Sequence, residues 1–431
     1  MARGRTTGTS GTTTDGRSRR GSGGAGPAVG AAGAAVPVTR GQVLRHRTRA
    51  QQLDRPLDDA RAPDDADVLD LGVQDTGTGG AAWSLVNRGV PLEADPARWP
   101  LELALAWSAR GAPHAYRRAD LPGVEVALRP YSPADAAKRV YDASRPLHEA
   151  GLTVPDALAA VAREMRRIVA EPTVKGEMST RLTAAMPAPY LRYCRPCDAT
   201  HLYEMPFRLA ALHAGLELEP GTSPPVLRRI PGWPPDHVAD LTPAPAPGAP
   251  GPGPEPVERL DVVRAYLHHL GPATPHDVAG YLDATLADVT ARWPRDVREV
   301  VVEGETRWVL EADADALLAD ARTATGTGTG TGDPVVRLLG PFDLYLQARD
   351  RSLLVADPAR QKDLWRTLGR PGAVLVDGEV LGTWRPKASG RRLTVVVDAW
   401  EPWSPAVQRA VEAEQERLAA HRGLTLVRAG A

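Results

Sequence analysis

Long apolar runs and cysteines are both scarce in this 431-residue sequence. No stretch approaches the roughly 18 consecutive apolar residues that a membrane-spanning helix requires, and the mean hydropathy is negative. The arginines near the N-terminus have no apolar segment behind them, so we expect neither a secretory signal nor a membrane anchor. Two cysteines exclude a disulfide framework and fit a reducing compartment, which predicts a cytoplasmic protein.

An excess of charge of one sign is also missing, because the net charge is −1. No global basic field therefore points to nucleic acid, although a local stripe of arginine can bind DNA on a neutral protein. Lysine occurs at only four positions, so nearly all cations are arginines: Lys138, Lys175, Lys362 and Lys387. Composition alone neither predicts nor excludes a DNA partner.

Segments of low complexity divide the chain into blocks. Residues 1–38 are rich in Gly, Ser, Thr, Arg and Ala without apolar periodicity, and we predict that they are disordered. A Pro/Ala/Gly spacer at 242–256 and a Thr/Gly repeat at 323–333 are predicted linkers. The predicted folded blocks therefore cover residues 39–241, 257–322 and 334–431.

The block at 257–322 is predicted to contain three helices and then a β-hairpin that turns at Gly304. This order describes a winged helix, which usually binds DNA through its third helix. That helix carries only Arg292 and two aspartates, so a DNA-binding and a scaffold role both stay open here. Residues 39–130 and 131–241 are predicted to form two further units of this kind.

Residues 334–431 alternate between strand-like runs and turns and end in a helix. The turns are expected at Asp377-Gly378 and Ser389-Gly390. We predict a small antiparallel β-barrel or sheet, closed by the C-terminal helix. The predicted class is α+β, with tandem winged-helix units followed by this β-barrel domain.

Cys194 and Cys197 have C-x-x-C spacing with His201 close behind, which raises zinc or redox chemistry. A fourth ligand would have to be His213 or a distant acid. We therefore favour a tight hairpin turn whose thiols bind no metal, and we predict no metal site and no cofactor.

In "VLDLGVQDTGTGG", residues 68–80, a short apolar run ends on two polar residues and then breaks into glycine. Asp-Thr-Gly after a strand is a common helix-entry sequence, in which the aspartate accepts a backbone N–H. If the backbone stays extended, Gln74 and Thr76 share one face and Asp75 points the other way. If the glycines bend the chain there, Asp75 turns toward the side of Gln74.

Several segments resemble, in order, landmarks of the winged-helix DNA-binding family that includes the AlkZ-like DNA glycosylases. They cover the chain from about 42 to 400 and read "RGAPHAYRRADL", "CRPCDATHLYEMPFRLAALHAG", "GPATPHDVAGYL", "LLGPFDLYLQARDRSLLVAD" and "VLVDGEVLGTWR". The resemblance implies three winged-helix units and a β-barrel around a DNA channel. It also implies metal-independent hydrolysis of the N-glycosidic bond in alkylated or crosslinked purine nucleotides. We expect a monomer that works on double-stranded DNA in the nucleoid.

The catalytic signature of that family is Gln-x-Gln, or in some members Gln-x-Asp, after an apolar Leu-Gly. The resemblance makes Gln74 the first catalytic residue and places Thr76, a departure from the pattern, in the second position. Asp75 is then the middle residue. A cationic alkylated base is a good leaving group, so the enzyme need only position water and stabilise an oxocarbenium-like sugar. A carboxylate does both, and an amide or hydroxyl orients water, so we expect Gln74 to act with Thr76 or Asp75.

Two groups of basic residues are candidate DNA contacts. The resemblance places the first group on the wing edge of the first unit, where it could contact phosphate. The second group flanks Asp350, and its arginines could either contact DNA or form salt bridges within the protein. The candidates are Arg110, His114, Arg117, Arg118, Arg349 and Arg351. The atypical triplet also leaves open a second function, that of a DNA-binding protein on the same scaffold without catalysis.

Overall fold

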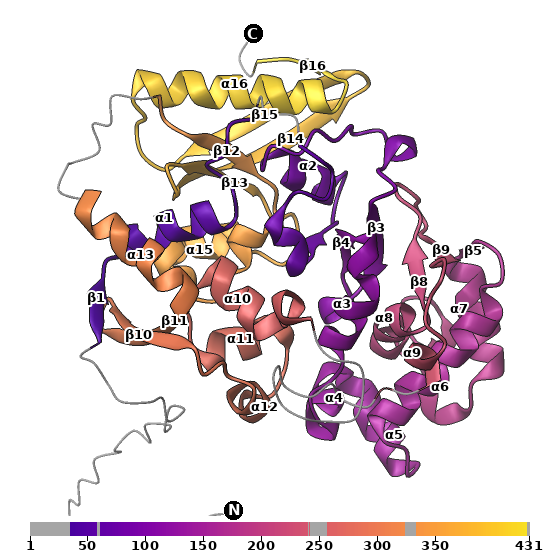
Figure 1. Ribbon diagram of the computed structural model, residues 1–431. Helices are drawn as coiled ribbons and strands as arrows, with labels where there is room; N and C mark the ends of the chain where they lie inside the picture. The colour runs from indigo at the N-terminus through magenta and orange to yellow at the C-terminus, as the bar shows by residue number, and fades with distance from the viewer. Residues whose placement is uncertain (1–34, 58–60, 240, 242–256, 324–332, 429–431) are drawn as a thin grey trace, which may run out of the picture. The chain divides into compact units, whose positions relative to one another are not determined.

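The computed structural model describes residues 35–57, 61–239, 241, 257–323 and 333–428, all of which belong to one compact unit (Figure 1). The predicted linkers and most of the predicted tail lie outside these residues. The end of the tail was wrongly predicted, because Val36–Val38 form strand β1, which pairs in parallel with β10 (Val297–Val302). Valine favours an extended, half-buried strand, and Val38 joins an apolar cluster with Val300.

The first elements place Gln74, Asp75 and Thr76, which we call the polar triplet, at the edge of a sheet. Helix α1 (Arg40–Ala50) begins with a capping box between Thr39 and Gln42. The apolar run expected as a strand is instead a 3₁₀ helix at Asp67–Asp70, and only Val73–Gln74 are extended, as β2. The chain then continues through α2 (Gly80–Val86), β3 (Leu103–Trp107), β4 (Pro113–Arg117) and α3 (Leu121–Leu128).

One six-stranded sheet runs through both halves of the long block, in the order β2-β4-β3-β8-β9-β5. Strand β3 is buried along its whole length and pairs with β8 at Leu105 and Leu218, so residues before and after 130 share this sheet. The two winged-helix units predicted at 39–130 and 131–241 thus have a sheet in common. The division of this block into two such units is still a prediction. The added strands are β5 (Thr173–Val174), β8 (Leu216–Leu218) and β9 (Val226–Arg229).

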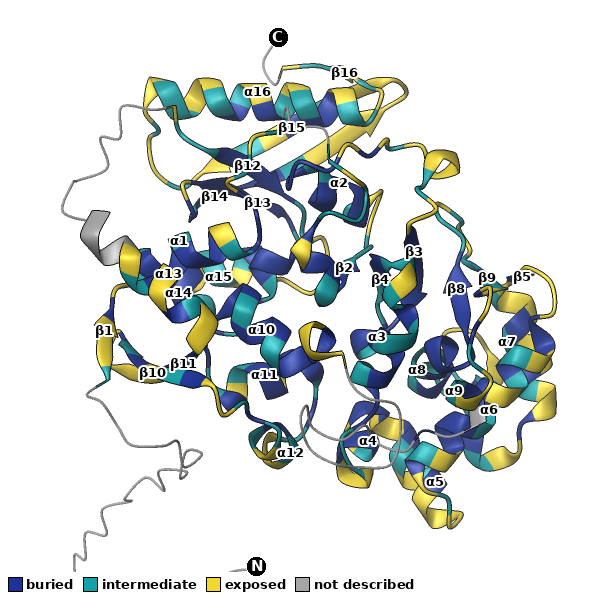
Figure 2. Cartoon of the chain, in the orientation of Figure 1, coloured by how far each residue is buried: buried dark blue, intermediate teal, exposed yellow. Residues whose placement is uncertain are grey.

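Helices cover the far end of this sheet. Helix α6 (Val154–Ile168) begins at the Thr153 cap, and its buried residues recur every three or four positions, so one apolar stripe faces the core. Figure 2 shows the same division into buried and exposed faces on α7. The other elements are α4 (Pro133–Arg139), α5 (Ser144–Glu149), α7 (Lys175–Ala185), α8 (Glu204–His213), α9 (Asp236–Ala239) and a separate hairpin of β6 (Leu191–Cys194) and β7 (Ala199–Leu202).

The third block has the predicted order of three helices and a hairpin. Its first helix begins at Val262, because Asp261 caps it, and the preceding residues Glu258–Leu260 form a short 3₁₀ turn. Strand β10 pairs with β11 in antiparallel register, and β1 occupies the other edge. The elements are α10 (Val262–Leu270), α11 (Pro275–Leu282), α12 (Leu286–Ala291), β11 (Glu305–Leu310) and α13 (Glu311–Thr323).

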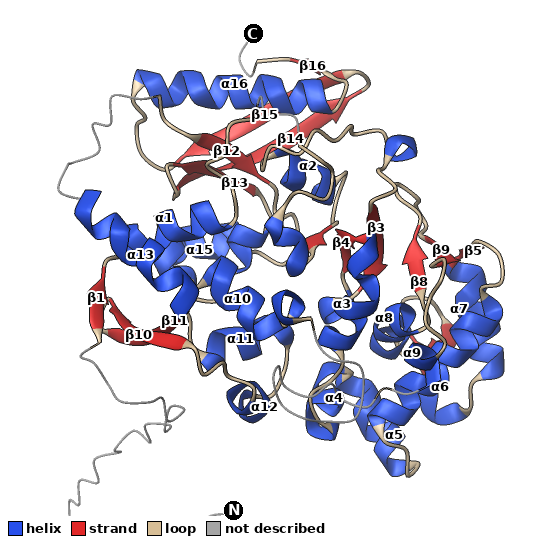
Figure 3. Cartoon of the chain, viewed as in Figure 1, coloured by secondary structure: helices blue, strands red, loops and turns tan. Residues whose placement is uncertain are grey.

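The C-terminal block is an open five-stranded sheet under a long helix (Figure 3). Of the two predicted forms, a barrel or a sheet, the described residues form the sheet, with β12 and β16 as its end strands. The predicted antiparallel order was wrong at one edge, where β15 pairs with β16 in parallel. Helix α16 (Pro405–His421) buries Val411 and Leu418 against the sheet. The strands are β12 (Val336–Leu339), β13 (Gly372–Val376), β14 (Glu379–Ser389), β15 (Arg392–Ala399) and β16 (Thr425–Leu426).

Between β12 and β13 the chain leaves the sheet and packs toward the N-terminal helices. This excursion contains a 3₁₀ helix, η8 (Leu344–Gln347), and the helices α14 (Arg351–Leu354) and α15 (Pro358–Leu364). Tyr345 Oη donates to the carbonyl of Gly378 at 2.6 Å, in one of the predicted turns. Among the described residues, no helix combines the length and apolarity needed to cross a bilayer.

Candidate active site

The backbone of the polar triplet is fixed just before the triplet begins. Gly72 has a φ of +82°, and a Cβ at this position would lie 2.4 Å from the ring of Tyr116. Only glycine fits such a conformation at such a close approach. Gln74 then pairs with His114 of β4, and glycines of positive φ lead the chain into α2.

Asp75 is directed away from the neighbouring polar side chains and toward the start of α2. Its Oδ1 accepts a hydrogen bond from the Ala81 N–H at 3.0 Å. Burial raises the pKa of Asp75, and hydrogen bonds from the N–H groups of Ala81 and Gly80 offset part of that rise. Of the two geometries that the sequence allowed, the structure has the one in which Asp75 caps the helix.

Gln74 and Thr76 share the opposite side, and both are half-buried. Gln74 Nε2 donates to Thr76 Oγ1 at 2.9 Å. A third side chain joins them, because Gln347 Nε2 donates to Gln74 Oε1 at 3.2 Å from a position 273 residues away. The same Nε2 donates to the Phe342 carbonyl at 2.9 Å, which fixes the orientation of the Gln347 amide. No local pattern in the sequence connects Gln347 with Gln74.

Arg110 extends this chain of hydrogen bonds to α11. Its Nη2 donates to Gln347 Oε1 at 2.6 Å, and Nη1 donates to the Tyr281 carbonyl. The guanidinium also lies over the Tyr281 ring, 4.6 Å from its centroid. Arg110 holds a left-handed backbone conformation with a φ of +56°, which is uncommon outside glycine and often found at functional sites.

A buried ion pair joins the segment after the triplet to the segment that carries Gln347. Arg88, just after α2, forms two hydrogen bonds of 2.9 Å with the carboxylate of Asp343, and both side chains are fully buried. Ser84 Oγ donates to the same carboxylate at 2.7 Å. The charge of Arg88 and these hydrogen bonds outweigh burial and lower the pKa of Asp343. The pair thus fixes α2 relative to η8.

His114 does not form the exposed wing-edge contact that the sequence suggested. The side chain is fully buried on β4, the strand that pairs with Gln74, and its Nδ1 lies 2.9 Å from Ser108 Oγ and 3.0 Å from the Ala112 carbonyl. Burial, and then the charge of Arg110, lower the pKa of His114 to about 3. His114 is therefore neutral near pH 7 and supports the sheet under the triplet.

Arg117 and Arg118 use their guanidinium groups within the protein. Arg117 donates to Asp70 and to the carbonyls of Asp64 and Ala66, which ties β4 to the preceding loop. Arg118 donates to Glu217 at 2.7 Å and to two backbone carbonyls. Of the four basic residues predicted as a patch at this edge, Arg117 and Arg118 bind groups within the protein and His114 is buried, while Arg110 contacts Gln347.

A different group of arginines gathers beside Gln347. We call this group the arginine cluster, and it consists of Arg110, Arg349, Arg351 and Arg370. None of the four forms an ion pair with a described carboxylate. Burial lowers the pKa of Arg349, Arg351 and Arg370, and the positive charges of other cluster members lower it further. The carboxylate of Asp283 acts on the pKa of Arg349 in the opposite direction. A group of cations without an ion-pair partner is a candidate site for an anion.

Two guanidinium groups of the cluster stack on aromatic rings. Arg351 lies over the Trp365 ring at 5.0 Å, and Arg370 lies over the Phe342 ring at 4.6 Å. Stacking orders a guanidinium and leaves its N–H edge available to phosphate. A groove of about 770 Å³ continues from Arg351 along α15, where it is lined by Lys362 and Arg366. The sequence analysis identified neither Arg370 nor this groove, because in the sequence their basic residues do not stand out among the many other arginines.

Asp350 behaves differently from its two neighbours. Its carboxylate binds the buried Arg47 at 2.6 Å and Arg307 at 2.9 Å, which joins the excursion to α1 and β11. The sequence left two alternatives for this segment, a salt bridge within the protein or contacts with DNA. Asp350 forms the internal salt bridges, whereas Arg349 and Arg351 belong to the arginine cluster.

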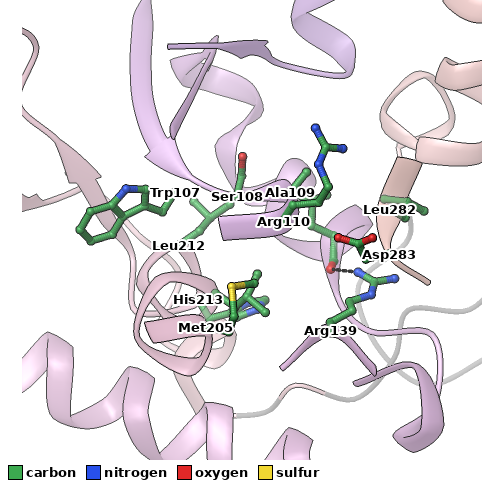
Figure 4. A pocket seen from close by; sticks show the side chains of 12 residues that line it. Trp107, Ser108, Ala109, Arg110, Arg139, Met205, Leu212, His213, Leu282 and Asp283 are labelled. Atoms are coloured by element: carbon green, nitrogen blue, oxygen red, sulfur yellow. Dashed lines mark hydrogen bonds between the residues drawn. The ribbon is translucent and has the colours of Figure 1, made fainter. Parts of the chain in front are cut away.

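A small cavity lies on the inner side of Arg110, between β3, α8 and the end of α11 (Figure 4). Its volume is about 30 Å³, and Ser108, His213 and Asp283 contribute to its lining. That space holds a water molecule or two and is too small for a nucleobase. The exposed side of Gln74 and the arginine cluster is therefore the better candidate for a large ligand.

Comparisons with known proteins agree with one another. The family model described as DNA glycosylase AlkZ-like matches residues 68–421. The solved structure of Streptomyces sahachiroi DNA glycosylase AlkZ is similar, with a TM-score of 0.62 and 22% sequence identity over 91% of this chain and 100% of that chain. No curated protein matches the sequence in a direct search.

Proposed function

Because the chain belongs to the AlkZ-like DNA glycosylase family, we propose that it hydrolyses the N-glycosidic bond of alkylated or crosslinked purine nucleotides in double-stranded DNA. Gln74 is the proposed catalytic residue, and the bond is cleaved without a metal ion. The protein would act as a monomer on DNA in the cytoplasm.

One observation carries this proposal. Gln74 and Thr76 place an amide and a hydroxyl side by side, with the amide of Gln347 3.2 Å from Gln74 and the arginine cluster next to it. Amides and hydroxyls orient water, and arginines without acidic partners bind the phosphates that flank a nucleotide. The triplet therefore needs no carboxylate of its own if Gln347 supplies the second amide.

In the proposed reaction, the side chains of Gln74 and Thr76 need only position a water molecule and stabilise the sugar cation. In N7-alkylated 2′-deoxyguanosine the C1′–N9 bond breaks, and its electron pair neutralises the cationic base as the base departs. Water adds to C1′ of the oxocarbenium-like sugar and loses a proton to solvent. Gln74 Oε1 and Thr76 Oγ1 would hold that water, and the Gln74 dipole would stabilise the positive sugar. Asp75 has no part in these steps, since its carboxylate caps α2.

The test uses the purified full chain and duplex DNA that contains N7-methylguanine or an N7-linked interstrand crosslink. We expect free base and alkali-labile abasic sites from one or both substrates, at the same rate with and without EDTA. Release of neither adduct contradicts the proposal, and release abolished by EDTA contradicts its metal independence.

A second function is favoured by the position of Asp75. No described carboxylate hydrogen-bonds with Gln74 or Thr76, so the same face also suits a protein that binds DNA without cleaving the glycosidic bond. DNA affinity that falls steeply with salt, without any base release, would identify this binder.

A further inference from the structure

The hairpin formed by β6 and β7 carries the C-x-x-C sequence at its tip. Cys194 pairs with Ala199 at the last position of the ladder, and residues 195–198 make the turn between them. Asp198, directly after the second cysteine, has a left-handed φ of +49°. This tight reversal places both thiols on the same side of the turn. The hairpin lies apart from the six-stranded sheet that carries Gln74.

Three potential metal ligands converge at this tip. The Sγ atoms of Cys194 and Cys197 and a ring nitrogen of His201 all lie within 4.8 Å of one another. The Cys194 sulfur accepts a hydrogen bond from the Cys197 backbone N–H and is also hydrogen-bonded with His201. Zinc bonds of about 2.3 Å to sulfur and 2.0 Å to nitrogen place tetrahedral ligands roughly 3.5–4 Å apart. Small side-chain rotations would bring the three groups to that spacing.

His201 is oriented as a ligand. Its Nδ1 lies 2.7 Å from the Leu202 carbonyl oxygen, so Nδ1 carries the proton and donates it there. The lone pair is then on Nε2, the atom left for the sulfur of Cys194. Histidines that bind a metal usually donate their other ring N–H to a carbonyl or carboxylate in this way.

Besides the ladder, a side-chain hydrogen bond crosses the tip of the hairpin, from Tyr193 Oη to Asp198 Oδ1. Residues 195–200 are all exposed, and Tyr193 is 59% exposed, so almost no apolar surface is buried there. A two-stranded hairpin of this kind is marginally stable in water without another constraint. A metal ion that bridges Cys194, Cys197 and His201 would supply that constraint by linking both strands and the turn.

We propose that Cys194, Cys197 and His201 bind one zinc ion, with water as the fourth ligand. The fourth residue that the sequence offered, His213, is elsewhere, since it is buried with its Nδ1 2.6 Å from Glu125. Two thiolates and an imidazole form a soft donor set that selects zinc over magnesium or calcium. The bound ion would constrain the turn that carries the exposed Arg195.

Metal content of the full chain, purified under reducing conditions with zinc present, tests the site. We expect about one zinc per chain, and about one cobalt after exchange, with the visible bands of a tetrahedral cobalt–thiolate centre. Cys197→Ser and His201→Ala should each lose most of the metal, whereas His276→Ala, an exposed histidine on α11, should keep it. Equal metal content in all four proteins would overturn the proposal.

A second measurement needs no variant to fold. Zinc should slow the alkylation of Cys194 and Cys197 by iodoacetamide at least tenfold in the wild-type chain, as read by mass spectrometry. Equal alkylation rates with and without zinc contradict the site. A Cys194–Cys197 disulfide that persists in reductant also contradicts it.

Discussion

Gln74 and Asp75 are adjacent, yet their side chains are held by different parts of the molecule. The amide of Gln74 contacts Thr76 and Gln347, whereas the carboxylate of Asp75 accepts a hydrogen bond from the first turn of α2. Strand geometry explains the division, because alternate side chains point to opposite faces. The negative charge of the triplet is thus used for helix capping.

Two substitutions at Asp75 separate capping from catalysis. Asp75→Ala should destabilise the fold by about 1 kcal/mol, the usual cost of a lost cap. Asp75→Asn keeps a capping oxygen and should release base at nearly the wild-type rate. Burial raises the pKa of Asp75, so its ionisation opposes folding. Asp75→Asn should therefore be most favourable at neutral pH, and this advantage should vanish below the unfolded-state pKa.

Urea unfolding at pH 7 and at a pH below the ordinary pKa of an aspartate, about 3, together with base-release assays, measures both effects. A large loss of activity in Asp75→Asn without a loss of stability would mean that the carboxylate is catalytic after all.

Gln347 is the residue for which the structure adds most to the sequence. Gln347→Ala should lower the single-turnover rate of base release about tenfold or more, because Gln74 loses the partner that orients its amide. DNA affinity and the melting temperature should change little. Gln408→Ala, an exposed amide on α16, is the matched control. An unchanged rate in Gln347→Ala would remove Gln347 from the proposed site.

At the scale of elements, α2 and η8 are joined by charge as well as by apolar packing. The Arg88–Asp343 pair is fully buried, and Trp83 Nε1 adds a hydrogen bond of 2.6 Å to the Leu338 carbonyl of β12. These contacts hold the triplet and Gln347 in a fixed relation although they come from opposite ends of the sequence.

Asp343→Asn should therefore be costly, because it leaves the Arg88 charge buried without an anion. We expect a loss of about 3–5 kcal/mol in the free energy of unfolding. Asp363→Asn, at the partly exposed pair with Arg385, should cost about 1 kcal/mol or less. Urea denaturation of the two variants provides the comparison. Similar costs for both would show that the buried pair does not fix α2 to η8.

Local elements could be predicted from the sequence far better than their assembly. Three helices before the hairpin of the third block and a helix at the C-terminal end were predicted, and the structure has α10, α11, α12 and α16 there. The short apolar run before Gln74 misled, because four apolar and acidic residues fit a 3₁₀ turn as well as a strand. Pairing of β3 with β8 and the open C-terminal sheet depend on long-range contacts.

The same limit applies to the site. Gln74 was found through its resemblance to a family motif, and the helix-capping position of Asp75 was one of two geometries that strand alternation allowed. His114 was misplaced because a sequence edge rich in arginine does not reveal which side chains the sheet buries. Gln347 and Arg370 could not be identified, because their importance depends on the fold that brings them to Gln74.

Over the whole molecule, the net charge of −1 hides a local excess of positive charge. Many described arginines are paired with carboxylates, whereas the four arginines of the cluster form no ion pair with a described carboxylate. In the groove beside Arg351, Arg366 pairs with Asp363, and Lys362 adds a further cation. Binding to DNA should therefore depend on few contacts and on salt.

Loss of one cluster arginine should reduce the salt dependence of DNA affinity by the contribution of one phosphate contact. Arg351→Ala and Arg370→Ala should each lower the slope of log Kd against log salt by about 1, if each contacts one phosphate. Arg409→Ala, exposed on α16, should leave the slope unchanged. Fluorescence anisotropy with a short duplex at several salt concentrations measures the slopes. Equal slopes for wild type and both cluster variants would place the DNA elsewhere.

The central claim is that Gln74 assists departure of a cationic base from DNA bound beside the arginine cluster. Single-turnover release of N7-methylguanine, with enzyme saturating over duplex DNA, tests it most directly in wild type and Gln74→Ala. The predicted result is a rate at least about 10²-fold lower in Gln74→Ala, with unchanged DNA affinity and melting temperature. Equal rates for the two proteins, at equal occupancy of the DNA, would contradict the claim.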